Sequence, residues 1–472
     1  MKVIFLILTL LITLLNHHLL SQVKITGNWL GKLKLPDGNE LRVVFKLSEE
    51  SENKYKALLD SPDQGVKDIT CEDVLIKNDS IIIKVPLVNG WYEGKIKWDA
   101  NIIEGKWYQA GQFLKLDLKY SEDYTGIKRP QEPKPPFPYK VEDVIFENED
   151  DGVYLSGTLT YPEEGESFPA VILITGSGPQ NRNEEVFGHK PFLVISDFLT
   201  RNGFAVLRFD DRGVGASTGD FSKATTFDHA NDVLWAIEYL KTRDEIDVDN
   251  IGLLGHSEGG MIAQIAAVEN PYDVKFIVML AGVAIPGDEL ILLQSEKIAL
   301  SEGRPKSEID ENIKRQKFII DLLKSDAPNH SIENEIRKFL SETFPDESKL
   351  NQQEREEIKK LIDNQIKTVT SDWYRNFLKF NPAVYLEKIK CPVLALNGEK
   401  DVQVPPKENL KAIENSLKKA DNKNFKVLEL KGLNHLFQSS NTGSISEYAM
   451  IEETISPVAL EEILNWLKEV VE

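Results

Sequence analysis

The chain has 472 residues, 41% of them hydrophobic, which is ordinary for a globular protein and long enough for two or three domains. Its formal net charge of −20 argues against nucleic acid as a partner, because clustered lysine and arginine are needed to hold a phosphate backbone. The two cysteines, Cys71 and Cys391, lie in separate apolar segments. They predict free buried thiols and cannot form a zinc site by themselves, and we expect no metal and no cofactor.

Residues 1–21 have the pattern of a secretory signal peptide. Lys2 precedes an apolar run over residues 3–15, and small or polar residues follow at Ser21 and Gln22. About 13 apolar residues fall short of the roughly 20 that cross a bilayer as a helix. We therefore expect a secreted or periplasmic protein with no membrane span in the mature chain, and an uncleaved anchor is the alternative.

Residues 22–125 alternate apolar and polar side chains in short runs separated by turn signals. No helical period occurs between these runs, so the pattern predicts a small antiparallel β-barrel or sandwich. The expected strands are 28–34, 40–47, 54–59, 80–86, 91–98, 102–109 and 113–118.

Residues 126–139 read as a linker between domains. Five prolines fall within the nine residues 130–138, and proline-rich chain is stiff and extended. The sequence therefore predicts a domain boundary here.

Residues 140–472 alternate strands with helices, and several strands are continuous apolar runs. Such runs are typical of a parallel sheet that is buried on both faces, so we expect an α/β domain. The expected strands are 170–174, 205–209, 251–254, 276–280, 393–396 and 425–430, and the expected helices are 190–202, 227–242, 258–269, 407–419 and 457–470.

One interval of about 110 residues, between Ala281 and Pro392, breaks this alternation. Glu, Lys, Ile and Leu recur there at helical spacing over 306–324, 331–340 and 352–369. An insertion of this size between two core strands predicts a helical cap, which we place at about residues 284–388.

The most informative motif is Gly-His-Ser-Glu-Gly at 255–259, between an apolar strand and a helix-like run. A strand that turns sharply into a helix strains the residue at its apex, and glycines at Gly255 and Gly259 would relieve steric overlap. Ser257 would then stand clear of the sheet as a nucleophile. A glycine-rich turn without catalytic function is the alternative.

A serine hydroxyl needs a base, and the base needs a carboxylate to orient it. Asp401 follows an apolar strand, and His435 follows the next strand along the chain, in the order Ser, Asp, His. Side chains at the ends of parallel strands converge on one crevice. We predict His435 as base and Asp401 as acid, and Glu399 could take the place of Asp401.

Two backbone N–H groups are expected to bind the oxyanion of a tetrahedral intermediate. Glu258 directly follows the nucleophile, and Ser177 lies in the glycine-containing loop 175–179 after an apolar strand. We predict these two N–H groups as the donors. The segment Asp210-Asp211-Arg212 reads as a braced turn beside the site, with an architectural role favoured over a catalytic one.

Residues from about 140 to 472 resemble the α/β-hydrolase superfamily, and more narrowly bacterial esterases and S33-type serine aminopeptidase-like hydrolases. The resemblance rests on five motifs in order: TGSGPQNRNE, LRFDDRGVGASTG, LLGHSEGG, CPVLALNGEKDVQVP and LNHLF. It implies Ser257, Asp401 and His435 as the triad, with Ser177 and Glu258 in the oxyanion hole. Where this family often has His-Gly, the loop begins with Thr175, so a side-chain contact from that position is in doubt.

The N-terminal segment is similar to the lipocalin-like domain that precedes some secreted hydrolases of this group, through Gly27-Asn28-Trp29 and the stretch 60–65. This resemblance covers about 100 residues with weaker motifs. It implies a small β-barrel and leaves its role open.

The predicted activity is hydrolysis of carboxylic esters of small molecules through an acyl-enzyme. A peptidase acting on short peptides is the first alternative, because the same triad cleaves amides. A ligand-binding protein without turnover is the second. Aromatic residues in the cap, Trp373, Tyr374, Phe377 and Phe380, could wall an acyl pocket, although helical spacing of aromatics is also typical of a plain core.

Overall fold

The computed structural model describes residues 25–35, 40–51, 54–109, 111–122, 128–325, 327–341 and 351–472. The expected signal peptide, residues 1–21, lies outside the described residues. The chain divides into two units, Met1–Lys128 and Arg129–Glu472, and each is described by itself.

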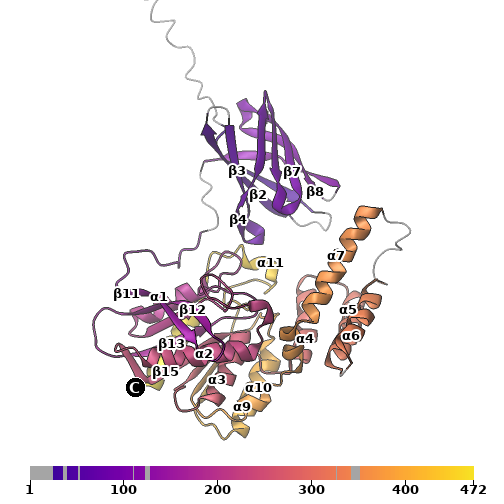
Figure 1. Ribbon diagram of the computed structural model, residues 1–472. Coiled ribbons are helices and arrows are strands. Elements are labelled where there is room, and N and C mark those ends of the chain that lie inside the picture. Colours follow the sequence, from indigo (N-terminus) through magenta and orange to yellow (C-terminus); the bar gives the residue numbers. More distant parts are fainter. Residues whose placement is uncertain are drawn as a thin grey trace, which may run out of the picture. The chain divides into compact units, whose positions relative to one another are not determined.

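The first unit is one continuous antiparallel sheet, as the alternating pattern predicts. Its strand order is β4-β3-β2-β1-β10-β8-β7-β6-β5, with β9 paired to β8 (Figure 1). The strands are β1 (Gly27–Lys34), β2 (Glu40–Ser51), β3 (Lys54–Ser61), β4 (Val66–Thr70), β5 (Glu72–Lys77), β6 (Ser80–Val85), β7 (Gly90–Lys97), β8 (Ile102–Gln109), β9 (Gln112–Lys115) and β10 (Leu118–Ser121).

The buried face of this sheet has its own core, centred on Trp29, Phe45 and Tyr92. In β1, Trp29, Gly31 and Leu33 are buried while their neighbours are more exposed, which is the period of two expected for a strand with one buried face. The sequence did not predict β4 and β5, because most residues of these strands are polar and exposed. The single strand expected over 113–118 is two strands, β9 and β10.

The proline-rich stretch belongs to the second unit from Arg129 onward. The Arg129 guanidinium donates to two carbonyls in 187–188 and to the carbonyls of Ala449 and Ile451, at 2.8 to 3.1 Å. Gln131 Nε2 donates a further hydrogen bond to the carbonyl of Ile455, four residues after Ile451. The part of the expected linker that follows Lys128 is therefore fastened to the second unit.

The second unit is built on an eight-stranded, mostly parallel sheet with the order β11-β12-β14-β13-β15-β16-β17-β18. All six expected strands are present, and this order with its antiparallel β12 confirms the α/β-hydrolase fold. The hairpin β11–β12 was not predicted. The strands are β11 (Tyr139–Asn148), β12 (Val153–Pro162), β13 (Phe168–Ile174), β14 (Ala205–Phe209), β15 (Ile246–His256), β16 (Ile277–Leu280), β17 (Val393–Gly398) and β18 (Phe425–Leu430).

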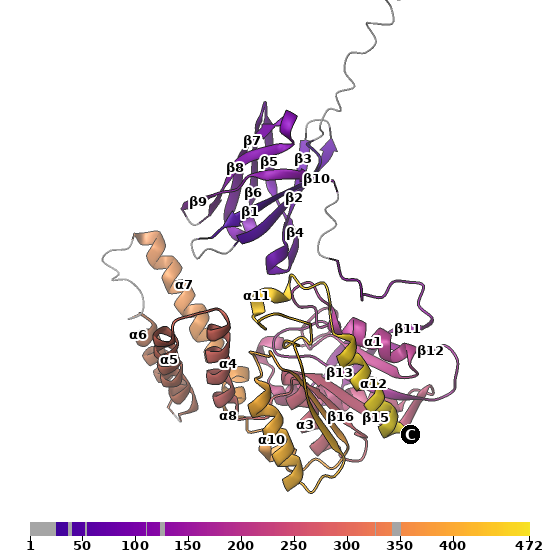
Figure 2. The same cartoon turned by 180° about the vertical axis from the view of Figure 1, so that it is seen from behind.

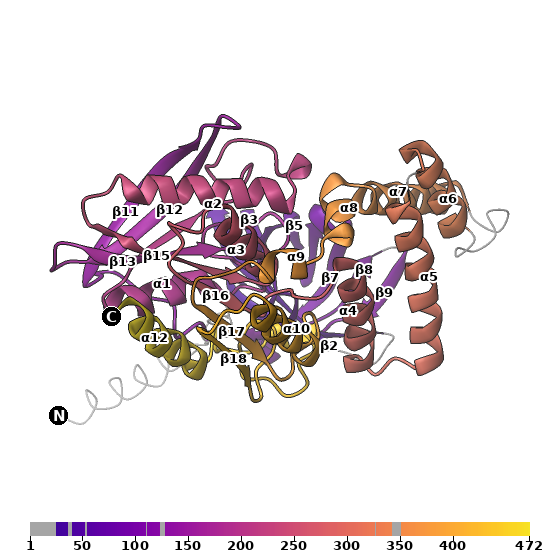
Figure 3. The same ribbon diagram turned by 90° about the horizontal axis from the view of Figure 1, so that it is seen from below.

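Helices cover both faces of this sheet, so the core strands are buried on both sides (Figure 3). On one face lie α2 (Thr226–Lys241), α3 (Glu258–Glu269) and α10 (Pro406–Lys419). On the other lie α1 (Pro191–Arg201) and α12 (Pro457–Val471). All five helices were expected within one residue or two of these bounds.

The insertion between β16 and β17 is helical, as expected, and α4 to α7 lie to one side of the sheet (Figures 1 and 2). The cap helices form a small core of their own that includes Leu323, Ile336 and Ile366. No helix in the described ranges has the length and apolar character to cross a membrane. The helices of the insertion are α4 (Gly287–Ser301), α5 (Lys306–Lys324), α6 (Asn329–Ser341), α7 (Gln352–Val369), α8 (Asp372–Lys379) and α9 (Ala383–Leu386).

Candidate active site

Ser257 stands at the apex of a sharp turn between β15 and α3. Its backbone has φ 54° and ψ −116°, a conformation that residues other than glycine rarely adopt. A Cβ on Gly255 would lie 2.0 Å from the Gly259 carbonyl oxygen, and a Cβ on Gly259 would lie 2.2 Å from the Ile174 carbonyl oxygen. Both glycines are therefore required by close backbone approach, as the motif predicts.

The turn holds Ser257 rigidly while leaving its hydroxyl unused. The Ser257 N–H donates to the Leu280 carbonyl at 2.8 Å, which fastens the apex to β16. Among the described residues, Ser257 Oγ has no hydrogen-bond partner, and the side chain is half-buried. Hydrogen bonds of a catalytic serine are often long before substrate binds and tighten afterwards.

His435 and Asp401 meet at the carboxyl ends of β18 and β17. His435 Nδ1 lies 2.8 Å from Asp401 Oδ2, and both side chains are buried. Asp401 Oδ1 accepts the N–H groups of Gln403 at 2.7 Å and Val404 at 2.8 Å, so the carboxylate has a fixed orientation. Exposed Glu399 instead accepts a backbone N–H from the loop after β18.

The loop after β13 lies against the serine. A Cβ on Gly176 would be 3.3 Å from the Ser257 Cβ, so the backbone here approaches the serine closely. Within the described part of the chain, the N–H groups of Ser177 and Glu258 have no internal acceptor. Glu258 is the first residue of α3, where helix N–H groups are left unpaired.

Asp211 braces this loop from the neighbouring strand β14. Its carboxylate accepts Thr175 Oγ1 at 2.7 Å and the Gln180 N–H at 2.8 Å. Burial raises the pKa of Asp211 to about 7, with smaller contributions from the negative charges of Glu184 and Asp232. The Thr175 side chain is thus committed to Asp211.

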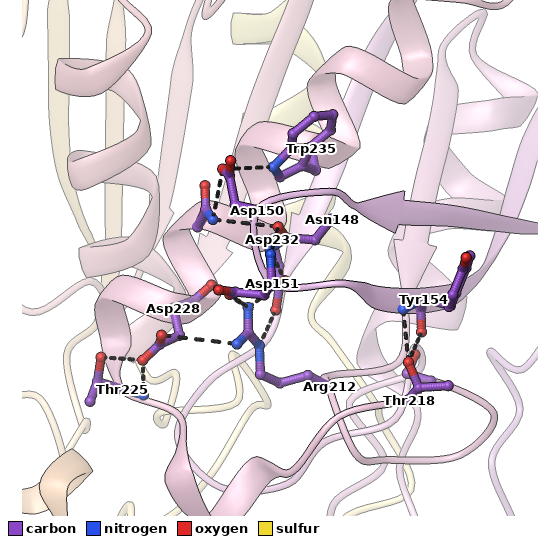
Figure 4. Close-up of polar contacts among 12 residues, drawn as sticks. Asn148, Asp150, Asp151, Tyr154, Arg212, Thr218, Thr225, Asp228, Asp232 and Trp235 are labelled. Atoms are coloured by element: carbon purple, nitrogen blue, oxygen red, sulfur yellow. Dashed lines mark hydrogen bonds and ion pairs between the residues drawn. The ribbon is translucent and has the colours of Figure 1, made fainter.

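Arg212, the next residue along the chain, is held by a separate group of carboxylates (Figure 4). Its guanidinium donates to both carboxylate oxygens of Asp232, at 2.7 and 2.8 Å, and to Asp151 at 2.8 Å. Asp210 is paired with Arg182 at 2.8 Å. These contacts agree with the predicted architectural role of residues 210–212.

A hollow of about 410 Å³, counted with the solvent at its mouth, opens beside this loop. Gly176, Asp211, His229, Glu258 and Trp373 are among the residues that line it. Removal from bulk water lowers the pKa of His229, which favours its neutral form. Sequence motifs alone did not indicate a role for the His229 side chain or for the Glu258 carboxylate.

The Glu258 carboxylate links the cap to the core. Its Oε1 accepts Thr226 Oγ1 at 2.6 Å and Trp373 Nε1 at 2.8 Å. Trp373, on α8, thus reaches the residue that follows the serine. Tyr374 packs in the cap core, and Phe377 packs beside Trp373 at a ring distance of 5.6 Å. Of the four aromatic residues considered for the pocket, Trp373 lines the hollow, whereas Tyr374, Phe377 and Phe380 do not.

A second buried histidine lies next to His435. His256 Nδ1 is 2.9 Å from Glu184 Oε1, and His256 Nε2 is 3.0 Å from the His435 carbonyl oxygen. The same Glu184 oxygen accepts the Gly176 N–H at 2.8 Å. Sequence motifs alone did not indicate a role for His256 or for Glu184, which ends the segment TGSGPQNRNE.

Comparison with known proteins identifies relatives for the second unit. A family model described as serine aminopeptidase, S33, matches residues 192–438, just over half of the chain. Esterase EstD of Thermotoga maritima is 27% identical over 332 residues, which cover 70% of this chain and 69% of EstD. Proline iminopeptidase of Lactobacillus delbrueckii subsp. lactis is 28% identical over 150 residues, 30% of this chain and 48% of that protein.

Solved structures of similar chains include Est1E from Butyrivibrio proteoclasticus with ferulic acid bound. It is 19% identical and has a TM-score of 0.41, with 70% of this chain and 97% of that chain covered. The α/β hydrolase GrgF from Penicillium sp. sh18 is 20% identical, with a TM-score of 0.43 and coverage of 70% and 98%.

Proposed function

The chain belongs to the serine aminopeptidase (S33) family of hydrolases, and we propose that it is a serine esterase that cleaves carboxylic esters of small molecules. The observation that carries this proposal is the 2.8 Å contact between His435 Nδ1 and Asp401 Oδ2 at the strand ends beside Ser257. EstD, which is 27% identical over 70% of this chain, is named as an esterase, and this name favours esters over amides as the substrates.

In the proposed reaction, Ser257 Oγ bonds to the ester carbonyl carbon while its proton passes to His435 Nε2. The resulting oxyanion accepts the N–H groups of Ser177 and Glu258. Collapse of the intermediate breaks the ester C–O bond, and the alcohol leaves with the proton from His435. Water then attacks the acyl-enzyme with His435 again as base, which releases the acid and restores Ser257.

Asp401 supports this cycle by holding His435 in one tautomer. A carboxylate at Nδ1 keeps the proton on that nitrogen, so that Nε2 is the atom that accepts from the serine. The two backbone N–H groups that Asp401 accepts keep its other oxygen occupied. The negative charge also stabilises the imidazolium that forms in each half-reaction.

The proposal is tested with purified protein and Ser257→Ala on p-nitrophenyl esters of graded acyl length and on aminoacyl amides. Loss of the nucleophile is expected to reduce kcat by about 10⁶-fold. Ser301→Ala, which removes a hydroxyl in the cap, is the matched control and is expected to keep its activity. Equal ester turnover by Ser257→Ala would refute the nucleophile assignment.

Aminopeptidase activity on short peptides is the second candidate, and the Glu258 carboxylate favours it. Glu258 directly follows Ser257 and lines the hollow beside loop 175–179, where a carboxylate can pair with the free amine of a peptide. The same assay separates the two, because turnover of aminoacyl amides alone would favour the peptidase. No turnover of either class by the wild-type protein would favour the ligand-binding alternative.

We also propose that the protein is secreted or periplasmic, on the pattern of residues 1–21. Mass spectrometry of protein from the producing cell is expected to find a mature N-terminus near Gln22. Recovery of the intact Met1 would instead indicate an uncleaved anchor.

A further inference from the structure

We propose that His256 and Glu184 form a constant imidazolium–carboxylate pair that positions the oxyanion loop against His435. The inference rests on the proposed function, in which His435 is the base. Neither residue is placed to touch the substrate's reacting atoms, so both act as positioning residues.

Hydrogen bonding at the two ring nitrogens determines the charge of His256. Nε2 faces the His435 carbonyl oxygen at 3.0 Å, and a carbonyl can only accept, so Nε2 carries a proton. Nδ1 faces Glu184 Oε1 at 2.9 Å, and that oxygen already accepts the Gly176 N–H. An oxygen that accepts both a backbone N–H and a ring nitrogen is best matched by the ionised carboxylate form of Glu184. The proton between Glu184 and His256 therefore lies on Nδ1, as the second ring proton.

The pair joins three segments that are distant in sequence. Glu184 holds Gly176, directly before the proposed donor Ser177, while His256 is itself the residue before Ser257. The bond to the His435 carbonyl spans 179 residues of chain. The oxyanion loop, the nucleophile turn and the loop of the base therefore share one network, and a shift in any of them would strain it.

The ionisable groups around His256 and His435 favour a positive charge on His256. The two ring centroids are 4.7 Å apart, and the ionisable groups that face His256 are Glu184, His435 and Asp401. Burial by itself lowers the pKa of His256, but the carboxylate of Glu184, together with the His435 carbonyl and the charge of Asp401, outweighs it, so the pKa is raised.

Glu184→Gln tests the proposal because it removes the charge and keeps the shape of the side chain. Without the carboxylate, buried His256 becomes neutral. Loss of loop alignment is expected to lower kcat about tenfold with little change in KM, since the oxyanion donors act in the transition state. Glu185→Gln is the matched control, since it is the adjacent, exposed carboxylate.

Nitrogen NMR of ¹⁵N-histidine in the wild-type protein is the second measurement, and it needs no activity. The His256 signal, assigned as the one that is missing from the spectrum of His256→Gln, is expected to have both ring nitrogens protonated throughout pH 5–8. A neutral His256 in that range would overturn the proposal, as would a Glu184→Gln variant that keeps the kcat of the wild type. If the wild-type protein lacks ester turnover, the proposed function fails, and the NMR result still decides the charge of the pair.

Discussion

Two carboxylates, Glu399 and Asp401, follow β17 within three residues, and the order of motifs in the sequence admits either as partner of the histidine. Their surroundings distinguish them. Asp401 is buried with one oxygen on two backbone N–H groups and the other on His435. Glu399 is exposed and accepts only from Gly432 among the described residues.

This difference predicts the outcome of replacing each carboxylate by its amide. Asp401→Asn is expected to lower kcat by about 10⁴-fold, because an amide N–H facing Nδ1 favours the wrong tautomer of His435. Glu399→Gln is expected to keep kcat close to that of the wild type. Steady-state ester hydrolysis by both variants provides the test, and the reverse ranking would assign the acid to Glu399.

At the scale of elements, the β15–α3 turn depends on backbone contacts that no side chain can replace. Gly259 packs against the end of β13, and Gly255 packs against Gly259 itself. These contacts and the hydrogen bond from the Ser257 N–H to the Leu280 carbonyl hold the turn in place, so the strained backbone of Ser257 is maintained.

Gly259→Ala is expected to reduce the free energy of unfolding by about 3 kcal/mol or more, because its Cβ would lie 2.2 Å from a carbonyl oxygen. Gly152→Ala is the control in the same unit. Gly152 has φ 65° with open space around it, so alanine there is expected to cost only about 1 to 2 kcal/mol of backbone strain. Urea unfolding measures both, and equal losses would mean that the turn relaxes around a side chain.

At the scale of the molecule, each unit buries a separate hydrophobic core. The first core is centred on Trp29 and the second on the eight-stranded sheet. The elements of the proposed active site all come from the second unit. Arg129 and Gln131 fasten the start of that unit to its C-terminal segment.

A chain that begins at Arg129 and ends at Glu472 is therefore expected to fold and to hydrolyse p-nitrophenyl acetate with nearly the kcat of the full-length protein. The physical reason is that its core and its site are complete without the first unit. Circular dichroism and the ester assay check the two expectations separately. A folded but inactive chain would mean that the first unit contributes to the site.

The sequence by itself determined the local structure and the identity of the reactive groups. Apolar runs predicted the parallel strands, and glycines flanking Ser257 predicted the sharp turn, because these features depend on neighbours along the chain. The order of Ser257, Asp401 and His435 was enough to propose a triad. The hairpin β11–β12 was missed because its alternating polar residues do not form the continuous apolar runs that marked the inner strands.

Only the tertiary structure decided which groups meet across long stretches of chain. It brought Glu184 to His256 over 72 residues and the cap residue Trp373 to Glu258 over 115. Neither pairing has a signature in sequence spacing, because each depends on how whole loops and helices pack around the ends of the strands. The charge state inferred for His256 follows from that packing, since it is set by which acceptors face its two ring nitrogens.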